Sequence, residues 1–227
     1  SFMVLAEESE QAVRAIIEAA QNAEPGTEDR KIGDLYASFM DETAIEANGT
    51  EVLRPLLALA DAPQSITALL ATIGSLERGG SAGFAQLFVD NDPGDPERYL
   101  VFLEQGGLGL PDESYYREEQ FEEIRQAYRA HVTTMLTLAG VVDPEAAAEL
   151  AIDLETQLAS HHWARVACRA AQKTYNPMAA AELAELTPSF DWQTWSAAAR
   201  VEPAVIAEVI VAQPSYLTGL ETLLTED

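Results

Sequence analysis

The chain has 227 residues, 48% of them apolar, so it is long enough to bury a hydrophobic core and is not a disordered segment. Its 38 acidic and 13 basic side chains give a formal net charge of −25, which repels phosphate backbones and anionic lipids. The sequence therefore argues against nucleic-acid and membrane partners. The single cysteine, Cys168, cannot form an internal disulfide, and no apolar run approaches the ~18 residues of a membrane span.

The first part of the chain is predicted to be helical, because apolar residues recur at three- and four-residue spacing among many alanines. The expected helices cover residues 5–17, 28–46, 54–60 and 65–76. Gly49 is placed to end the second helix and Ser65 to cap the fourth, which Gly79 and Gly80 stop. Because the chain begins inside an apolar helical pattern without a capping residue, we expect that further sequence precedes it.

The middle of the chain has a different pattern. Phe84 to Val89 and Arg98 to Leu103 are short runs rich in aromatic and β-branched residues, and the turn-forming residues 90–96 separate them. This pattern predicts one β-hairpin that contains the only substantial strands of the chain. Since both runs are almost continuously apolar, we expect helices to cover both faces of the hairpin.

Helical spacing returns after the glycine-rich segment 105–111. The expected helices cover residues 121–139, 144–171, 179–186, 192–199, 203–211 and 214–224. Asp143 and Pro144 suit the start of the second of these helices, and Asn176 with Pro177 the start of the third. With no repeat and no long linker, we expect a single mainly α domain over residues 1–227, with many helices and one β-hairpin at about 84–103.

Metal sites are not indicated by the histidines or by the acidic turn. His161 and His162 are adjacent, so on a helix their side chains diverge by roughly 100° and cannot clamp one zinc ion, and the sequence contains no His-Glu-x-x-His. We interpret one histidine as a hydrogen-bonded core residue and the other as a surface residue. The turn around Gly94 lacks calcium-loop spacing, since the place of the bidentate glutamate falls on Val101.

Nucleotide binding and covalent catalysis are not indicated either. Gly106, Gly107 and Gly109 are not followed by Lys-Ser/Thr, and acidic residues come directly after Pro111, where a phosphate would lie. Cys168 has no nucleophile signature around it. No pair of carboxylates is set apart as a general acid and base. The sequence thus predicts no catalytic, cofactor-binding or metal-binding residue in this chain.

Four strings nevertheless carry a resemblance to a known family. They are Lys-Ile-Gly-Asp-Leu-Tyr-Ala-Ser-Phe-Met-Asp-Glu at 31–42, Gln-Gly-Gly-Leu-Gly-Leu-Pro-Asp-Glu-Ser-Tyr-Tyr at 105–116, Lys-Thr-Tyr-Asn-Pro-Met at 173–178 and Phe-Asp-Trp at 190–192. Together and in this order they resemble the N-terminal region of the neprilysin family of zinc metallopeptidases. The resemblance extends from Phe2 to about Leu224. With a single cysteine, the chain resembles the bacterial members of the family rather than the animal members, which are rich in disulfides.

The residues that carry the resemblance are expected to be structural. Glycines let the backbone leave the second strand sharply, proline fixes the exit, and tyrosines and indoles anchor the surrounding segments. This structural signature comprises Leu108, Gly109, Leu110, Pro111, Tyr115, Tyr116, Tyr175, Asn176, Phe190, Asp191 and Trp192.

The resemblance implies a parent enzyme that cleaves peptides with a zinc-activated water. It places the zinc and its ligands in a C-terminal catalytic domain that this chain does not contain, so that domain and peptide substrates are the implied partners. The implied role of this chain is a non-catalytic lobe that caps the active-site cavity and limits substrates to peptides. By itself the chain is expected to be inactive.

A second interpretation comes from a different class of protein. The chain could be a free-standing helical interaction module that has lost the peptidase half. A search downstream of Asp227 for His-Glu-x-x-His separates the two interpretations. The sequence leaves the compartment open between a bacterial cytoplasm and export without disulfides.

Overall fold

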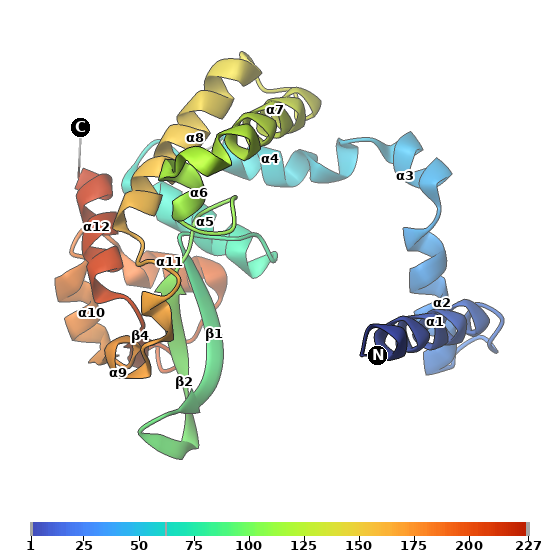
Figure 1. The fold of residues 1–227 in the computed structure, drawn as a ribbon, viewed down its shortest axis with the longest axis horizontal. Coiled ribbons are helices and arrows are strands. Elements are labelled where there is room, and N and C mark those ends of the chain that lie inside the picture. Colours follow the sequence, from blue (N-terminus) through green and yellow to red (C-terminus); the bar gives the residue numbers. More distant parts are fainter. Residues whose placement is uncertain (1, 62, 226–227) are drawn as a thin grey trace. The chain divides into compact units, whose positions relative to one another are not determined.

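The computed structural model describes residues 2–61 and 63–225 (Figure 1). The chain folds as two compact units, residues 1–53 and residues 54–227. Each unit is described by itself, and the elements keep the labels of Figure 1.

The first unit is a helical hairpin followed by short helical turns. It comprises α1 (Phe2–Ala20), α2 (Glu28–Phe39), α3 (Glu42–Asn48) and a 3₁₀ turn at Glu51–Leu53. Thr27 caps α2, its hydroxyl accepting a hydrogen bond from the Arg30 backbone N–H at 3.2 Å. A side chain at Gly33 would collide with the backbone at the end of α1, so this glycine lets the two helices approach closely.

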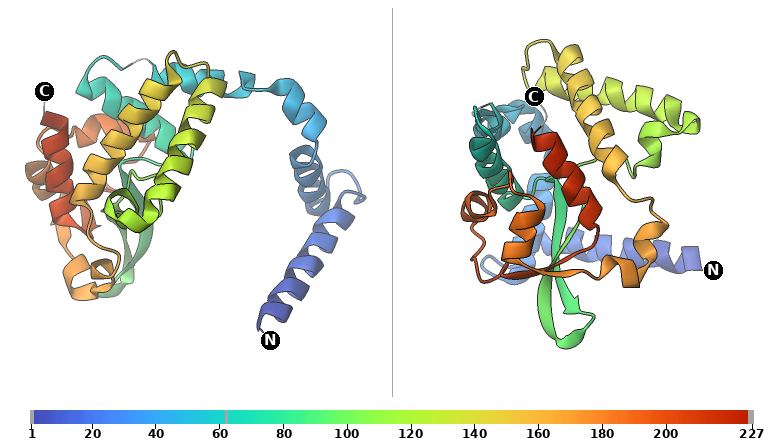
Figure 2. Two further views of the ribbon diagram at one scale, coloured as in Figure 1. Left: turned by 45° about the horizontal axis from the view of Figure 1, so that its top comes forward. Right: turned by 90° about the vertical axis from the view of Figure 1, so that its left-hand side faces the viewer.

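The second unit contains the remaining helices and a small sheet. Its helices are α4 (Arg54–Ala60), α5 (Ile66–Arg78), α6 (Ser114–Arg117), α7 (Glu122–Leu138), α8 (Pro144–His161), α9 (Ala171–Thr174), α10 (Ala180–Leu186), α11 (Trp192–Ala199) and α12 (Pro214–Thr225), with 3₁₀ turns at Glu119–Phe121 and Ala167–Arg169. Helices α7 and α8 lie side by side, as Figure 2 shows. The mainly α class predicted from the sequence is confirmed.

The sheet has four strands in the order β1-β2-β4-β3. Strands β1 (Ala85–Asp92) and β2 (Asp95–Gln105) form the predicted antiparallel hairpin. Strand β4 (Glu208–Val211) pairs parallel with β2, and β3 (Pro177–Ala179) pairs antiparallel with β4. The prediction that the hairpin holds the only substantial strands is therefore wrong, because β4 extends the sheet beyond it.

Strand β4 replaces part of a predicted helix. The spacing of residues 203–211 predicts a helix, but Glu208–Val211 is a strand and the segment before it consists of turns. Val209 and Ile210 are completely buried, since β4 lies between β2 and β3 inside the sheet. A short run that is apolar at every position suits a strand with both faces covered, and periodicity cannot distinguish it from a buried helix.

Three other predicted boundaries differ from the structure. The helix predicted for 28–46 breaks at Met40, because the Asp41 side chain caps a new helix by accepting from the Ala44 backbone N–H. The helix from Pro144 ends at His161 and does not continue toward 171. Pro177 begins β3 rather than a helix, and α10 starts only at Ala180.

The hydrophobic core of the second unit lies around the sheet and α11. Phe84, Phe190, Trp192 and Trp195 form an aromatic cluster there, with ring centroids 4.3–6.5 Å apart. Burial does not extend along the whole hairpin, which projects from the rest of this unit (Figures 1 and 2). Val89 and Tyr99 are 62% and 66% exposed, so the expectation that both hairpin faces are covered fails for the outer half.

Candidate functional site

A cleft of about 960 Å³ lies in the second unit, where the sheet meets the glycine-rich loop. Parts of α5, the start of β1, the end of β2, the loop after β2 and the segment after α8 form its walls. Its charged and aromatic lining residues are Glu77, Arg78, Glu104, Asp112, His162, Trp163, Arg165 and Trp195. A concave site that combines apolar walls with a few polar groups has the composition of a ligand site.

The glycine-rich loop owes its course to two tyrosines and one glutamate. The Tyr116 hydroxyl accepts from the Leu110 backbone N–H at 3.0 Å and donates to Glu155 Oε2 at 2.7 Å. Tyr128 donates to the other oxygen of Glu155 at 2.9 Å, and a side chain at Gly109 would collide with Tyr128. Burial and the hydrogen bond to Glu155 raise the pKa of Tyr128 to about 12, so it stays a donor at neutral pH.

Other residues of the signature in this loop pack around it. Leu108, Leu110 and Pro111 line the cleft, whereas Tyr115 stacks on Phe121 with ring centroids 4.0 Å apart. Residues 105–116 therefore lie at the cleft and next to helices α7 and α8.

Glu77 is a half-buried hydrogen-bond acceptor in the cleft wall. Trp195 Nε1 donates to Glu77 Oε2 at 2.5 Å, while Glu77 Oε1 is buried and has no hydrogen-bond partner among the described residues. Burial raises the pKa of Glu77, and the hydrogen bond from Trp195 opposes that shift. A side chain at Gly83 would collide with this carboxyl group, so the glycine makes room for it.

Hydrogen bonds join the end of β2 to the segment after α8 and to Gln213 at the cleft. Gln105 joins two segments, because its backbone N–H donates to Gln213 Oε1 and its side chain exchanges two hydrogen bonds with the Trp163 backbone. His162 Nε2 lies 2.9 Å from the carbonyl oxygen of Gly106, which requires a proton on Nε2. Burial lowers the pKa of His162, so this histidine is neutral at pH 7.

Cys168 is a half-buried thiol at the same cleft. Its Sγ lies 3.8 Å from the Trp163 carbonyl oxygen, and burial raises its pKa. A raised pKa keeps the thiol protonated and opposes nucleophilic reactivity.

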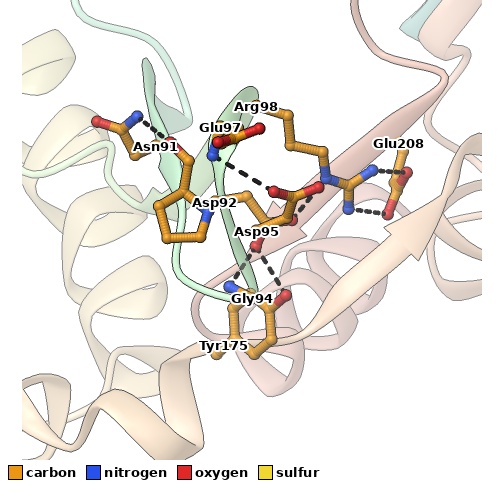
Figure 3. A network of polar contacts seen from close by, with 9 residues as sticks. Asn91, Asp92, Gly94, Asp95, Glu97, Arg98, Tyr175 and Glu208 are labelled. Carbon is orange, nitrogen blue, oxygen red and sulfur yellow. Dashed lines mark hydrogen bonds and ion pairs between the residues drawn. The ribbon is translucent and has the colours of Figure 1, made fainter.

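Tyr175 anchors the far end of the hairpin (Figure 3). Asp92, which is 1% exposed, accepts from the Tyr175 hydroxyl at 2.7 Å, from the Gly94 backbone N–H at 2.8 Å and from Arg98 Nε at 2.7 Å. Arg98 also forms two hydrogen bonds of 3.0 Å with Glu208 at the start of β4. The hydrogen bond from Tyr175 is the main cause that lowers the pKa of Asp92.

The remaining signature residues lie around β4 and α11. Asn176 Nδ2 donates to the Val211 carbonyl oxygen at 2.9 Å, which ties the segment before β3 to β4. Asp191 caps α11 by accepting from the backbone N–H groups of Gln193 and Thr194. Phe190 and Trp192 belong to the aromatic core.

Several site residues were not found from the sequence. Glu77 with Arg78, Arg165 and Gln213 come from three separate segments, and none belongs to a short motif. A helix-terminal Glu-Arg pair is an ordinary surface feature in a sequence, so only the tertiary contact of Glu77 with Trp195 distinguishes it.

Two other kinds of site are absent from the described part of the chain. No group of three or more His, Cys, Asp or Glu side chains within residues 2–61 and 63–225 is arranged to hold a metal ion. None of the helices in these ranges has the length and apolar character needed to cross a membrane.

The whole chain matches a known family model. A model described as "Peptidase family M13" covers residues 1–227. Endothelin-converting enzyme-like 1 from Mus musculus is 25% identical over 211 residues, which make up 85% of this chain and 27% of that protein. Membrane metallo-endopeptidase-like 1 from Mus musculus is 26% identical, over 98% of this chain and 32% of that protein. The chain thus spans about a third or less of the length of these relatives.

Solved structures agree with that match. The zinc metalloprotease Zmp1 of Mycobacterium tuberculosis, solved in complex with an inhibitor, superposes with a TM-score of 0.90 and is 39% identical, covering 98% of this chain and 35% of that one. PepO from Lactobacillus rhamnosis HN001 superposes with a TM-score of 0.80 at 22% identity, over 98% of this chain and 36% of that chain, a likeness of fold.

Proposed function

The chain belongs to peptidase family M13, and we propose that it is the non-catalytic N-terminal lobe of a zinc metalloendopeptidase, which covers the catalytic lobe and limits access to peptides. The zinc would be held by the catalytic lobe, where it would activate water for peptide hydrolysis. The 227 residues contain no His-Glu-x-x-His sequence, so this lobe is proposed to hydrolyse no peptide by itself. Its contribution would be the exclusion of water and of large substrates.

The observation that carries this proposal is the apolar surface of the first unit. Helix α1 has no buried residue along its 19 positions, although it presents large apolar side chains. On α2, Leu35 and Phe39 lie one turn apart and are 72% and 73% exposed. An apolar groove of about 500 Å³ between these helices is lined by Val13, Ile17, Tyr36 and Met40, among others.

Exposed apolar surface of this kind marks a contact site. The occupant we propose is the catalytic lobe, because solved relatives of this fold are nearly three times as long as this chain. A free-standing module would have a polar, finished surface instead, and the first unit does not have one.

Sedimentation velocity tests the proposal. The chain is examined over a hundredfold concentration range, alone and with the separately produced catalytic lobe of its parent enzyme. We expect weak self-association of the chain alone and a 1:1 complex with the catalytic lobe. The double variant Leu35→Ser, Phe39→Ser should lose most of that affinity, whereas Val166→Ser, which changes an equally exposed residue of the second unit, serves as the matched control.

A functional readout accompanies the binding measurement. Adding the chain to the catalytic lobe should reduce cleavage of an unfolded protein more than cleavage of a short peptide. If the chain is strictly monomeric and does not bind the catalytic lobe, the capping role is overturned and the free-standing interaction module is favoured.

A further inference from the structure

The cleft of the second unit brings together two arginines that have no carboxylate partner. Arg78 lies at the end of α5 and Arg165 in the segment after α8, and neither forms an ion pair with any residue in the described ranges. Arg169, Lys173 and Arg200 likewise form no ion pair with any residue that the structure describes, but they do not line the cleft. The distinguishing feature is therefore that Arg78 and Arg165 both line one concave site and lack an ion-pair partner among the described residues.

The acidic groups of the cleft leave these arginines available. One oxygen of Glu77 accepts from Trp195, and Asp112 accepts from the backbone and the hydroxyl of Ser114. Glu104 is the remaining carboxylate of the lining, and it lies on β2. The cleft lining thus carries Arg78 at the end of α5, Arg165 in the segment after α8, and three carboxylates, none of which is ion-paired with either arginine among the described residues.

The cleft adjoins an open sheet edge. Strand β1 is the outermost strand on this side, and residues Ala85 to Leu87 line the cleft. In an antiparallel pair, alternate backbone N–H and C=O groups point away from the partner strand. Within the described residues, those groups have no backbone partner from Gln86 to Asp90, so an extended peptide could pair with them.

We propose that this cleft binds an extended peptide that pairs with the outer edge of β1 and places an acidic side chain against Arg78 and Arg165. The proposal rests on the proposed function, since it assumes that the lobe meets peptides. A guanidinium group binds a carboxylate through two parallel hydrogen bonds, which gives a local attraction. The net charge of −25 repels such a peptide at long range, so the preference must arise from these short-range contacts.

Fluorescence anisotropy on the intact 227-residue chain tests the proposal. The probes are two labelled peptides with blocked ends, Thr-Val-Thr-Glu-Thr-Val-Thr and the same sequence with Gln in place of Glu. We expect the Glu peptide to bind about tenfold more tightly than the Gln peptide at physiological salt. The variants Arg78→Gln and Arg165→Gln should weaken binding of the Glu peptide only, whereas Arg169→Gln and Arg200→Gln are matched controls outside the cleft.

Two further arms separate alternative contacts. The Gln peptide with a free C-terminus shows whether a terminal carboxylate replaces the side chain, and a preference for it over the blocked Glu peptide would overturn the assignment. Peptides N-methylated at alternate amides test the strand pairing, because only one of the two alternating sets should lose binding.

The proposal fails if the Glu and Gln peptides bind equally, or if Arg169→Gln weakens binding as much as Arg78→Gln. Far-UV circular dichroism confirms that the variants stay folded. The assay contains no catalytic lobe, so its failure is independent of the sedimentation experiment that tests the capping role.

Discussion

The two units of this chain share helical patterning but differ in what their apolar residues contact. In residues 54–227, apolar side chains converge on a sheet and an aromatic cluster, and seventeen buried residues form one core. Among the described residues of the first unit, 2–53, only Gly33 is buried within a helix. An amphipathic pattern therefore predicts that a helix has an apolar face, but it does not show that the same chain covers this face.

The largest effect expected from this comparison concerns Ile210 and Ile16. Ile210→Ala should lower the free energy of unfolding by about 2–5 kcal/mol, because it leaves a cavity at a fully buried position of β4. Ile16→Ala, at a position that is 68% exposed on α1, should change it by less than about 0.5 kcal/mol. Urea titrations followed by tryptophan fluorescence and by circular dichroism measure both, and equal losses would contradict the distinction between the units.

A pair of tyrosines gives a smaller contrast. The buried Tyr216 hydroxyl donates to the Phe84 carbonyl oxygen at 2.5 Å, so Tyr216→Phe should cost about 1–2 kcal/mol by leaving that oxygen without its donor. Tyr36→Phe removes a 3.4 Å hydrogen bond to Glu18 at the surface of the first unit and should be nearly neutral. The same urea titrations apply, and a costly Tyr36→Phe would show that the first unit is more tightly packed than its exposure indicates.

The Asp92 network predicts a pH dependence confined to the second unit. The pKa of folded Asp92 lies below its ordinary value of 3.8, so the stability that its charge contributes is present above that value and is lost as the pH falls through the folded pKa. Asp92→Asn should flatten this part of the acid limb while lowering stability at pH 7. Acid titrations of the thermal midpoint measure both, with Asp90→Asn at an exposed position of β1 as the control, and an unchanged acid limb would contradict the assignment.

The smallest expected effect is the response to salt. A net charge of −25 makes the acidic groups repel one another at pH 7, so physiological sodium chloride should raise the thermal midpoint by roughly 2 °C through screening. Amide hydrogen exchange should show the larger gain in the first unit, which has little buried surface to oppose the repulsion. A flat or falling midpoint would argue against self-repulsion.

The sequence by itself determined the elements whose signals are local. Ser65, which the sequence predicts as a helix cap, accepts a hydrogen bond from the Ala68 backbone N–H three residues on. The β1–β2 hairpin follows from two apolar runs around a turn-forming segment. The family was also readable from the sequence, because its motif strings occur in order along the whole chain.

Only the tertiary structure decided the elements and contacts in which long-range packing overrides the local secondary-structure preference of the sequence. Glu208–Val211 becomes a strand because β2 and β3 offer it partners on both sides, whereas its apolar run by itself would also suit a buried helix. The cleft likewise could not be predicted from the sequence, because the hydrogen bond between Glu77 and Trp195 joins residues that are 118 positions apart. Spacing reveals contacts within a helix or a turn, whereas the meeting of distant segments depends on the free energy of packing the whole unit.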